Sequence, residues 1–270
     1  MLVTNSINAF KNLLNYFQIK LWPVTYNLFL SNLKAKYVGS ILGPVWLILE
    51  PALFVAIVTL VFSQAFNNQV SSIPYALFVM PGLLIWSFFF GQTQSATTIF
   101  LNNRELLTNT TAPKEAVVLA KCLIGAVDYV IRLAILLVWW WLYIGSFPLA
   151  GLIASLLVGL SLLVGLFGFS MLLAIGNVYF RDFNSIVPIL LQLFFYISPI
   201  IYPVSVIPIK WLWLIQLNPI AAMVEFLRSA LFENQLDLIQ LGTFLSWILV
   251  ICGLSWLIFK KFGTRLVEEL

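Results

Sequence analysis

Long apolar runs alternate with short polar connections along most of this 270-residue chain. A helix that crosses the hydrocarbon core of a bilayer needs about 20 mostly apolar residues, so runs of that length predict membrane-spanning helices. Six runs qualify, at residues 41–64, 75–100, 116–143, 149–176, 185–203 and 238–259. The pattern predicts one all-α integral membrane domain over residues 1–270, with a six-helix bundle over 41–259.

The stretch before the first run has a different pattern. Within residues 7–21, apolar side chains recur near helical spacing, and the opposite side carries Lys and amide residues. Such a stripe is typical of a helix that lies flat at a membrane interface. Residues 1–37 are therefore predicted to form an N-terminal amphipathic interface helix and elbow. This helix is either a surface anchor or a docking element for a partner.

The fifth run is irregular. It contains Pro188 and Pro199 and continues into SPIIYPVSVIPIKWLWLIQLNP, which is apolar without forming a second clean span. Broken backbone at membrane depth is tolerated only where protein or a cavity surrounds it. We therefore expect re-entrant or interfacial helices over residues 198–235, on the outer side of the bundle.

Composition and charge agree with a membrane protein. The chain is 62% hydrophobic and 9% charged, with a mean hydropathy of +1.03, whereas about half of a soluble domain is apolar. With a cytoplasmic N-terminus, most of the 14 basic residues fall on the inside, as Lys and Arg do in membrane proteins. This inside set is Lys11, Lys20, Lys34, Lys36, Arg104, Lys114, Lys121, Arg181, Lys260, Lys261 and Arg265. Both termini are thus expected in the cytoplasm, and topology explains the net charge of +4 without nucleic-acid binding.

Several kinds of chemistry are missing from the sequence. It has no His, which is the commonest metal ligand and the usual general base near neutral pH. It also has no GxxxxGK[ST] phosphate-binding loop. The two cysteines, Cys122 and Cys252, are far apart in apolar surroundings, so neither a disulfide nor a metal pair is indicated. We expect no catalytic residues, no metal and no cofactor in this chain.

Charged residues inside apolar runs are costly and are functional candidates by default. Glu50 precedes Pro51 in the first run, where the pair either forms a kink or contributes to a gate or substrate contact. Asp128 and Arg132 are four residues apart, on one face of the third run. They either neutralise each other, or Arg132 binds a phosphate group.

Two further features are open to more than one interpretation. Arg181 and Asp182 lie in the short segment NVYFRDFNS, as a solvated turn or as part of a functional site. Aromatic triplets such as Trp139, Trp140 and Trp141 either belong to interfacial belts or line a path. Consecutive side chains point around a helix, so no triplet can place all its rings in one channel.

A polar island, NNRELLTNTTAPKEAVVLAK, interrupts the chain at residues 102–121. It separates the second and third runs on the predicted cytoplasmic side. It is longer than a simple connection needs, which favours a docking element for another protein over a solvated loop.

Five short motifs occur in order along the chain. They are LKAKYVGSILGPVWLILEP at 33–51, the polar island with its Pro-Lys-Glu turn, NVYFRDF, SPIIY at 198–202, and LNPIAAMVEFLR. Together they resemble the membrane (permease) subunit of bacterial type-2 ABC exporters for polysaccharides. That family handles O-antigen, capsule and teichoic acid, and the resemblance covers most of the chain.

The resemblance implies an assembly of two copies of this chain with two copies of a separate ATP-binding subunit, which would carry ATP and Mg²⁺. The cargo would be a glycan on a polyprenyl diphosphate lipid, exported from the cytoplasmic side across the bacterial plasma (inner) membrane. ATPase coupling is expected at Arg104, Glu105, Pro113, Lys114, Glu115, Phe10 and Phe17. Gate or substrate contacts are expected among Glu50, Arg132, Tyr37, Trp46, Arg181, Asp182, Tyr196 and Tyr202.

Two other classes of protein fit the sequence less well. A secondary transporter or channel without an ATPase partner would place coupling-ion acids at the membrane midplane, usually within an inverted repeat. Only Asp128 fits that description, Arg132 lies beside it, and no repeat is visible. A polytopic enzyme would need paired membrane acids or a His-based metal site, and the sequence shows neither.

Overall fold

The computed structural model describes residues 16–37, 45–66, 73–263, 266 and 269, and every regular element among them is a helix. The long helices are α2 (Trp22–Tyr37), α3 (Trp46–Phe66), α4 (Tyr75–Ala96), α7 (Lys114–Ile144), α8 (Leu149–Tyr179), α9 (Phe183–Ile197) and α12 (Leu238–Phe262). The short ones are η1 (Tyr16–Leu21), α5 (Ile99–Asn102), α6 (Arg104–Asn109), η4 (Val204–Val206), η5 (Ile209–Trp211), α10 (Leu212–Gln216), α11 (Pro219–Arg228) and η6 (Ser229–Glu233). The predicted all-α fold class is confirmed. Most of the amphipathic stretch 7–21 lies outside the described residues.

Four helices are both long and apolar enough to cross a membrane, namely α4, α7, α8 and α12. They match four of the predicted runs to within a few residues at each end. The other two runs correspond to shorter apolar segments, Ile48–Gln64 of α3 and the whole of α9. α9 ends earlier than predicted because Ser198 is extended, as the residue before a proline prefers to be.

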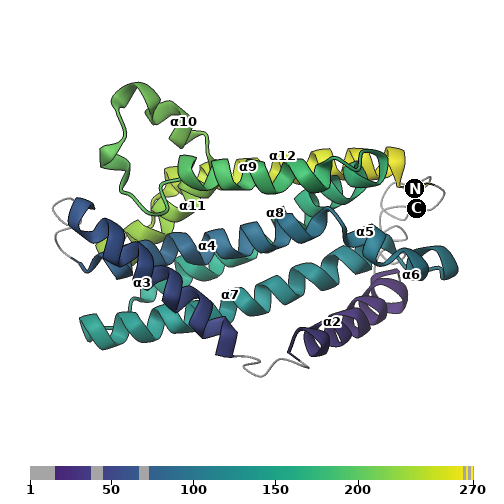
Figure 1. The fold of residues 1–270 in the computed structure, drawn as a ribbon, viewed down its shortest axis with the longest axis horizontal. Helices are drawn as coiled ribbons and strands as arrows, with labels where there is room; N and C mark the ends of the chain where they lie inside the picture. Colours follow the sequence, from purple (N-terminus) through teal and green to yellow (C-terminus); the bar gives the residue numbers. More distant parts are fainter. Residues whose placement is uncertain (1–15, 38–44, 67–72, 264–265, 267–268, 270) are drawn as a thin grey trace, which may run out of the picture.

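α4, α7, α8, α9 and α12 run along a bundle between its two ends, and α2 and α3 lie obliquely to it (Figure 1). One end carries η1, α5, α6, the turn between α8 and α9, and the last residues of α12; we call it the island end. Residues 198–236, with α10 and α11, lie at the opposite end, which we call the cap end. The polar island and the Arg181–Asp182 turn are therefore on the same side of the bundle, as the predicted topology requires.

A continuous apolar core fills the space between α4, α7, α8, α11 and α12. The Trp86 ring of α4 lies 5.2 Å from the Phe195 ring of α9, measured between centroids. On α7, Trp140 is buried in this core, whereas Trp139 and Trp141 are exposed. The three consecutive Trp rings therefore do not form one lining, as the helical periodicity predicted.

The cap end is tied to the bundle by two polar side chains of the LNPIAAMVEFLR motif. Asn218 caps α11 by accepting hydrogen bonds from the backbone amides of Ile220 (2.9 Å) and Ala221 (3.2 Å). Its side-chain amide also donates to the Ser198 hydroxyl at 2.9 Å. The motif therefore fixes the start of α11 against the SPIIY segment.

Arg228, at the end of α11, is buried in the bundle with 4% of its surface exposed. Its guanidinium donates to the carbonyl oxygens of Pro199 (2.7 Å), Ile200 (2.8 Å) and Phe78 (3.3 Å), and to the Glu225 carboxylate (2.8 Å). Burial lowers the pKa of this guanidinium, and the Glu225 carboxylate opposes that shift. We call these contacts the Arg228 clasp. They show that α11 packs into the end of the bundle, while α10 lies on its exposed side.

The contact between α7 and α8 depends on a glycine. A Cβ atom at Gly159 of α8 would lie 2.6 Å from Cε1 of Tyr129, and the Tyr129 hydroxyl donates to the Ser155 carbonyl at 2.7 Å. Small residues allow such close helix approach in membranes.

We expect Gly159→Leu to reduce the free energy of unfolding by about 1–3 kcal/mol, because the new side chain overpacks the Tyr129 ring. Thermal unfolding of the purified protein in detergent would measure the loss. Gly253→Leu on α12 is the matched control, because no atom lies within 4 Å of its added Cβ. Equal stability of the two variants would contradict this account of the α7–α8 contact.

Candidate functional site

The polar island is anchored to the bundle by apolar side chains on one of its sides. Ile99 and Phe100 of α5 and Leu107 of α6 are buried in a second apolar cluster, which includes Val117 of α7 and Ile175 of α8. This cluster is separate from the main core and lies under the island. α5 and α6 of the island are therefore packed against the bundle and are not a free loop.

The other side of the island is exposed and polar. Arg104, Glu105, Thr108 and Asn109 of α6 are all exposed. The Thr108 hydroxyl donates to the Arg104 carbonyl at 2.9 Å, so it is satisfied within its own helix. A short helix held rigidly by its apolar side thus presents a polar surface at the end of the bundle.

Contacts between distant segments fix the surroundings of this surface. The Lys114 ammonium donates to the Gly263 carbonyl, which joins the start of α7 to the end of α12. The Thr97 hydroxyl donates to the Asn184 side-chain oxygen at 3.2 Å, which joins the end of α4 to the start of α9. These two contacts connect the ends of four of the helices that surround the island.

The predicted coupling residues fall into three groups. Arg104 and Glu105 are exposed, as a docking role requires. Pro113 is buried as the residue that precedes α7, and Lys114 and Glu115 are partly buried. Two aromatic residues give no test, since Phe10 lies outside the described residues and Phe17 lies in η1 without a described side chain.

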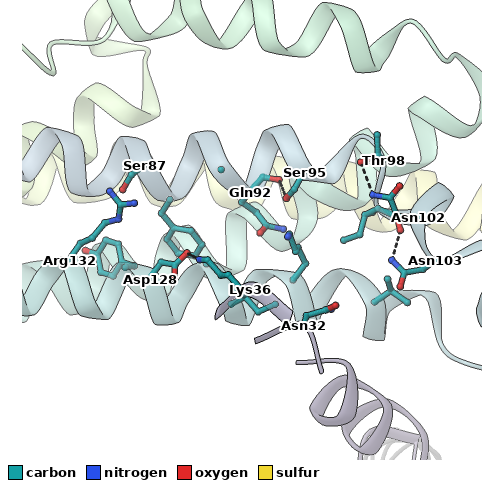
Figure 2. A pocket seen from close by; sticks show the side chains of 18 residues that line it. Asn32, Lys36, Ser87, Gln92, Ser95, Thr98, Asn102, Asn103, Asp128 and Arg132 are labelled. Carbon is teal, nitrogen blue, oxygen red and sulfur yellow. Dashed lines mark hydrogen bonds and ion pairs between the residues drawn. The ribbon is translucent and has the colours of Figure 1, made fainter. Parts of the chain in front are cut away.

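A polar groove lies between α4 and α7, with α2 beside it (Figure 2). Its volume is about 580 Å³, within the range of about 300–1,000 Å³ typical of ligand sites. We call it the α4–α7 groove. Its lining residues are Asn32, Lys36, Ser87, Phe88, Gly91, Gln92, Ser95, Thr98, Ile99, Asn102, Asn103, Val117, Lys121, Ile124, Gly125, Asp128, Tyr129 and Arg132.

Two stripes of polar and small residues form the groove. On α7 the stripe consists of Lys121, Gly125, Asp128 and Arg132, and on α4 through α5 it consists of Ser87, Gly91, Ser95, Thr98 and Asn102. Spacings of three and four residues keep side chains on one helix face. Figure 2 shows side chains from both helices pointing into the space between them. The groove therefore forms where the polar face of α7 meets the polar face of α4 and α5.

The charges of the groove are paired between helices. Lys36 of α2 forms an ion pair with Asp128 of α7. Arg132 of α7 lies 3.5 Å from the Glu50 carboxylate of α3, measured from Nη2 to Oε2. The prediction that Asp128 and Arg132 neutralise each other is wrong, because α2 and α3 bring an ion-pair partner to each of them. The Glu50 side chain is 70% exposed, and an ion pair with so exposed a partner contributes about 0–1 kcal/mol.

The sequence interpretation missed Lys36 and Lys121 as site residues, together with the polar stripe of α4. Lys36 belongs to the first motif and Lys121 ends the polar island, but neither was predicted as a gate or substrate contact. The spacing of Lys121 to Asp128 and Arg132, seven and eleven residues, was a usable signal because it places all three on one helix face. The position of Lys36 relative to them depends on how α2 packs.

Trp46, Arg181, Asp182, Tyr196 and Tyr202 are not among the residues that line the groove, and the side chain of Tyr37 is outside the described part of the chain. Tyr37 is the last residue of α2, and Trp46 is the exposed first residue of α3. Arg181 and Asp182 are exposed in the turn at the island end, close in sequence to the start of α9.

Tyr196 and Tyr202 lie near the cap end. Tyr196 is exposed on α9. The Tyr202 hydroxyl donates to the carbonyls of Tyr196 (2.8 Å) and Ile197 (3.2 Å), in the last turn of α9, where carbonyls lack partners within the helix. This gives Tyr202 a capping role, and a contact of either tyrosine with cargo stays a prediction.

A second, larger cavity of about 890 Å³ lies among α8, α9, α11 and α12. Its lining is almost entirely apolar. Among the described residues, no three His, Cys, Asp or Glu side chains come together as a metal site would need. The α4–α7 groove is therefore the more polar of these two cavities.

An all-helical bundle of membrane length, with a polar groove between its helices and an exposed polar helix at one end, is typical of a multi-pass membrane protein. Residues 25–232 match the family described as ABC-2 type transporter. The chain belongs to this family.

Similar proteins of known role cover most of the chain. The O-antigen export system permease protein RfbA of Klebsiella pneumoniae is 27% identical over 242 residues, which is 89% of this chain and 92% of that protein. RfbA of Myxococcus xanthus is 29% identical over 206 residues, covering 76% of this chain and 78% of the relative. The polysialic acid transport protein KpsM of Escherichia coli is 22% identical over 210 residues, covering 78% and 81%.

Proposed function

We infer that this chain is the permease subunit of an ATP-driven exporter that moves polysaccharide across the bacterial inner membrane. Its family and the printed roles of its relatives, O-antigen export and polysialic acid transport, support this class. The subunit itself forms the membrane path, and ATP hydrolysis belongs to a separate subunit.

The observation that carries the proposal is the rigid, exposed side of the polar island. Arg104 and Glu105 project from a helix that is anchored through Leu107 to a buried apolar cluster. A surface that must transmit movement has to be stiff, since a flexible loop would absorb the displacement. We propose that this surface docks an ATP-binding subunit, in an assembly of two such subunits with two copies of this chain.

The topology follows from the same assignment. α3 and α9 complete six membrane spans together with α4, α7, α8 and α12. The island end faces the cytoplasm, where Lys and Arg are enriched in membrane proteins. Both termini are then cytoplasmic, and the residues of the cap end, including α11, form the outer re-entrant region.

The cargo is a glycan carried on a lipid diphosphate that enters from the cytoplasmic side. The α4–α7 groove supports this cargo class because its cations suit phosphate and its hydroxyl and amide groups suit sugar hydroxyls. Repeated movement of a polymer past this region would be driven by the ATPase.

The proposal is tested by purifying the tagged chain from its native membrane in mild detergent and identifying what accompanies it by mass spectrometry. We expect a subunit with a phosphate-binding loop at one copy per chain, and polysaccharide export that stops when ATP is depleted. Recovery of this chain alone, with transport that survives ATP depletion, would instead identify a secondary transporter or channel.

A further inference from the structure

Positive charge exceeds negative charge in the α4–α7 groove. Its lining contains the cations Lys36, Lys121 and Arg132 and one carboxylate, Asp128, which leaves a net charge of +2 from three positive and one negative group. Glu50, which pairs with Arg132 from α3, reduces this to +1. The imbalance lies against helices of membrane-spanning length, where unbalanced charge is expensive.

Two of these cations repel each other. Lys121 lines the same groove as Lys36 and Asp128, so its ammonium group is repelled by the first and attracted by the second. Asp128 is already the ion-pair partner of Lys36. One carboxylate does not neutralise two ammonium groups, so the groove keeps a net positive charge that favours the binding of an anion.

The polar groups around the cations fit a phosphate that is joined to a sugar. The Ser87 hydroxyl donates to the Leu84 carbonyl at 3.0 Å, and the Ser95 hydroxyl donates to the Gln92 carbonyl at 3.1 Å. Each of these hydroxyl oxygens can still accept a hydrogen bond. Cations on α2 and α7 would thus bind phosphate, while acceptors on α4 receive the hydroxyl groups of an adjoining sugar.

The surroundings of the groove fit an anion carried on a lipid. α3 crosses near the Arg132 end of the groove and exposes apolar residues such as Phe54 and Ile57. α7 likewise exposes Val130 and Val138. A hydrocarbon chain can follow these surfaces while its headgroup enters the groove.

We propose that the α4–α7 groove is a binding site for the phosphate-bearing headgroup of a lipid, with Lys36, Lys121 and Arg132 as its phosphate ligands. Asp128 competes with this headgroup for Lys36 and holds the groove together when it is empty. The cargo's lipid diphosphate and an anionic membrane phospholipid share this chemistry. Only the choice of the cargo lipid rests on the proposed function.

The test uses the complete complex with its ATP-binding subunit in nanodiscs of phosphatidylcholine, which has no net charge. A long-chain polyprenyl diphosphate is titrated, and its binding is measured by native mass spectrometry. The double variant Lys121→Gln, Arg132→Gln is expected to bind it about 10- to 100-fold more weakly, as the loss of charge-assisted hydrogen bonds predicts. The matched control is Lys34→Gln, Lys210→Gln, which removes two exposed cations that do not line the groove and is expected to bind like the wild type.

A variant that is expected to raise the affinity, and not lower it, separates an effect on binding from an effect on folding. Asp128→Asn removes the competing carboxylate and is expected to bind polyprenyl diphosphate severalfold more tightly, a gain that damage to the fold would not produce. The charge-conserving variant Lys121→Arg, Arg132→Lys is expected to restore most of the affinity.

Parallel titrations identify the source of the phosphate. Polyprenyl diphosphate binding that phosphatidylglycerol fails to displace supports the cargo lipid, and equal competition supports a membrane phospholipid in the same site. Unchanged binding of both lipids in the Lys121 and Arg132 double variant would overturn the site. If that result came with normal ATP-dependent export, the proposed export function would stand without a lipid site in the α4–α7 groove.

Discussion

Exchanging the charges of two exposed residues on the polar island, by the double change Arg104→Glu and Glu105→Arg, is expected to reduce polysaccharide export at least tenfold. Both side chains lie on α6, at the surface proposed to dock the ATP-binding subunit. The exchange keeps the net charge of the chain but reverses each local contact, and mispaired charges across an interface cost several kcal/mol. Export by intact cells and the ATPase subunit recovered per permease would measure the effect.

The fold should tolerate this exchange, because substitutions of exposed residues usually change the free energy of unfolding by no more than about 0.5 kcal/mol. One acidic residue also remains in the first turn of α6, where it interacts favourably with the helix dipole. The matched control is Lys210→Glu, Glu233→Lys, an exchange of two exposed charges at the cap end. Full export and full recovery of the ATPase subunit by the Arg104, Glu105 variant would remove the island from the coupling role.

Substitutions in the Pro113-Lys114-Glu115 turn would test the coupling role of the island less specifically. Pro113 is buried at the start of α7, and Lys114 donates to the Gly263 carbonyl at the end of α12. Changing all three to Ala would loosen this connection as well as any docking contact. A loss of export by that variant would therefore not distinguish coupling from local stability.

Arg228→Gln is expected to reduce the free energy of unfolding by about 3–5 kcal/mol, the cost typical of removing one partner from a buried charged contact. The change leaves Glu225 without its partner and removes donors from the carbonyls of Pro199, Ile200 and Phe78. Buried polar groups without partners are what make such substitutions costly. Thermal unfolding in detergent and the amount of protein in the membrane would both report the loss.

Arg228→Lys should be intermediate, because an ammonium keeps the charge but cannot reproduce the planar, forked geometry of the guanidinium. Lys210→Gln is the control for removing a cation near the cap end, since Lys210 is exposed. Wild-type stability of Arg228→Gln would mean that apolar packing alone holds α11 against the SPIIY segment.

The sequence determined the class of protein and the positions of its main helices. Uninterrupted apolar runs of membrane length have few alternatives to a helix, because every backbone polar group must be satisfied within the segment. This is why α4, α7, α8 and α12 begin and end close to their predicted limits. The polar island could also be recognised from the sequence, because its polar residues interrupt an otherwise apolar pattern.

Helical periodicity also predicted part of the candidate site. The spacing of Asp128 and Arg132 correctly placed both side chains on one face of α7, and that face lines the groove. Periodicity could not predict their partners, because Lys36 and Glu50 come from helices about 80 to 90 residues earlier in the chain. The assumption that neighbours on one helix pair with each other was therefore wrong here.

The tertiary structure alone decided how these surfaces combine. The α4–α7 groove requires three helices to meet, and Arg228 became a structural clasp because α11 packs into the bundle end and removes the arginine from water. A helical period fixes which side chains share a face, since it depends on a few neighbouring residues. Which faces meet depends on the burial of apolar surface and the pairing of buried charge over the whole chain, and a linear pattern does not contain that information.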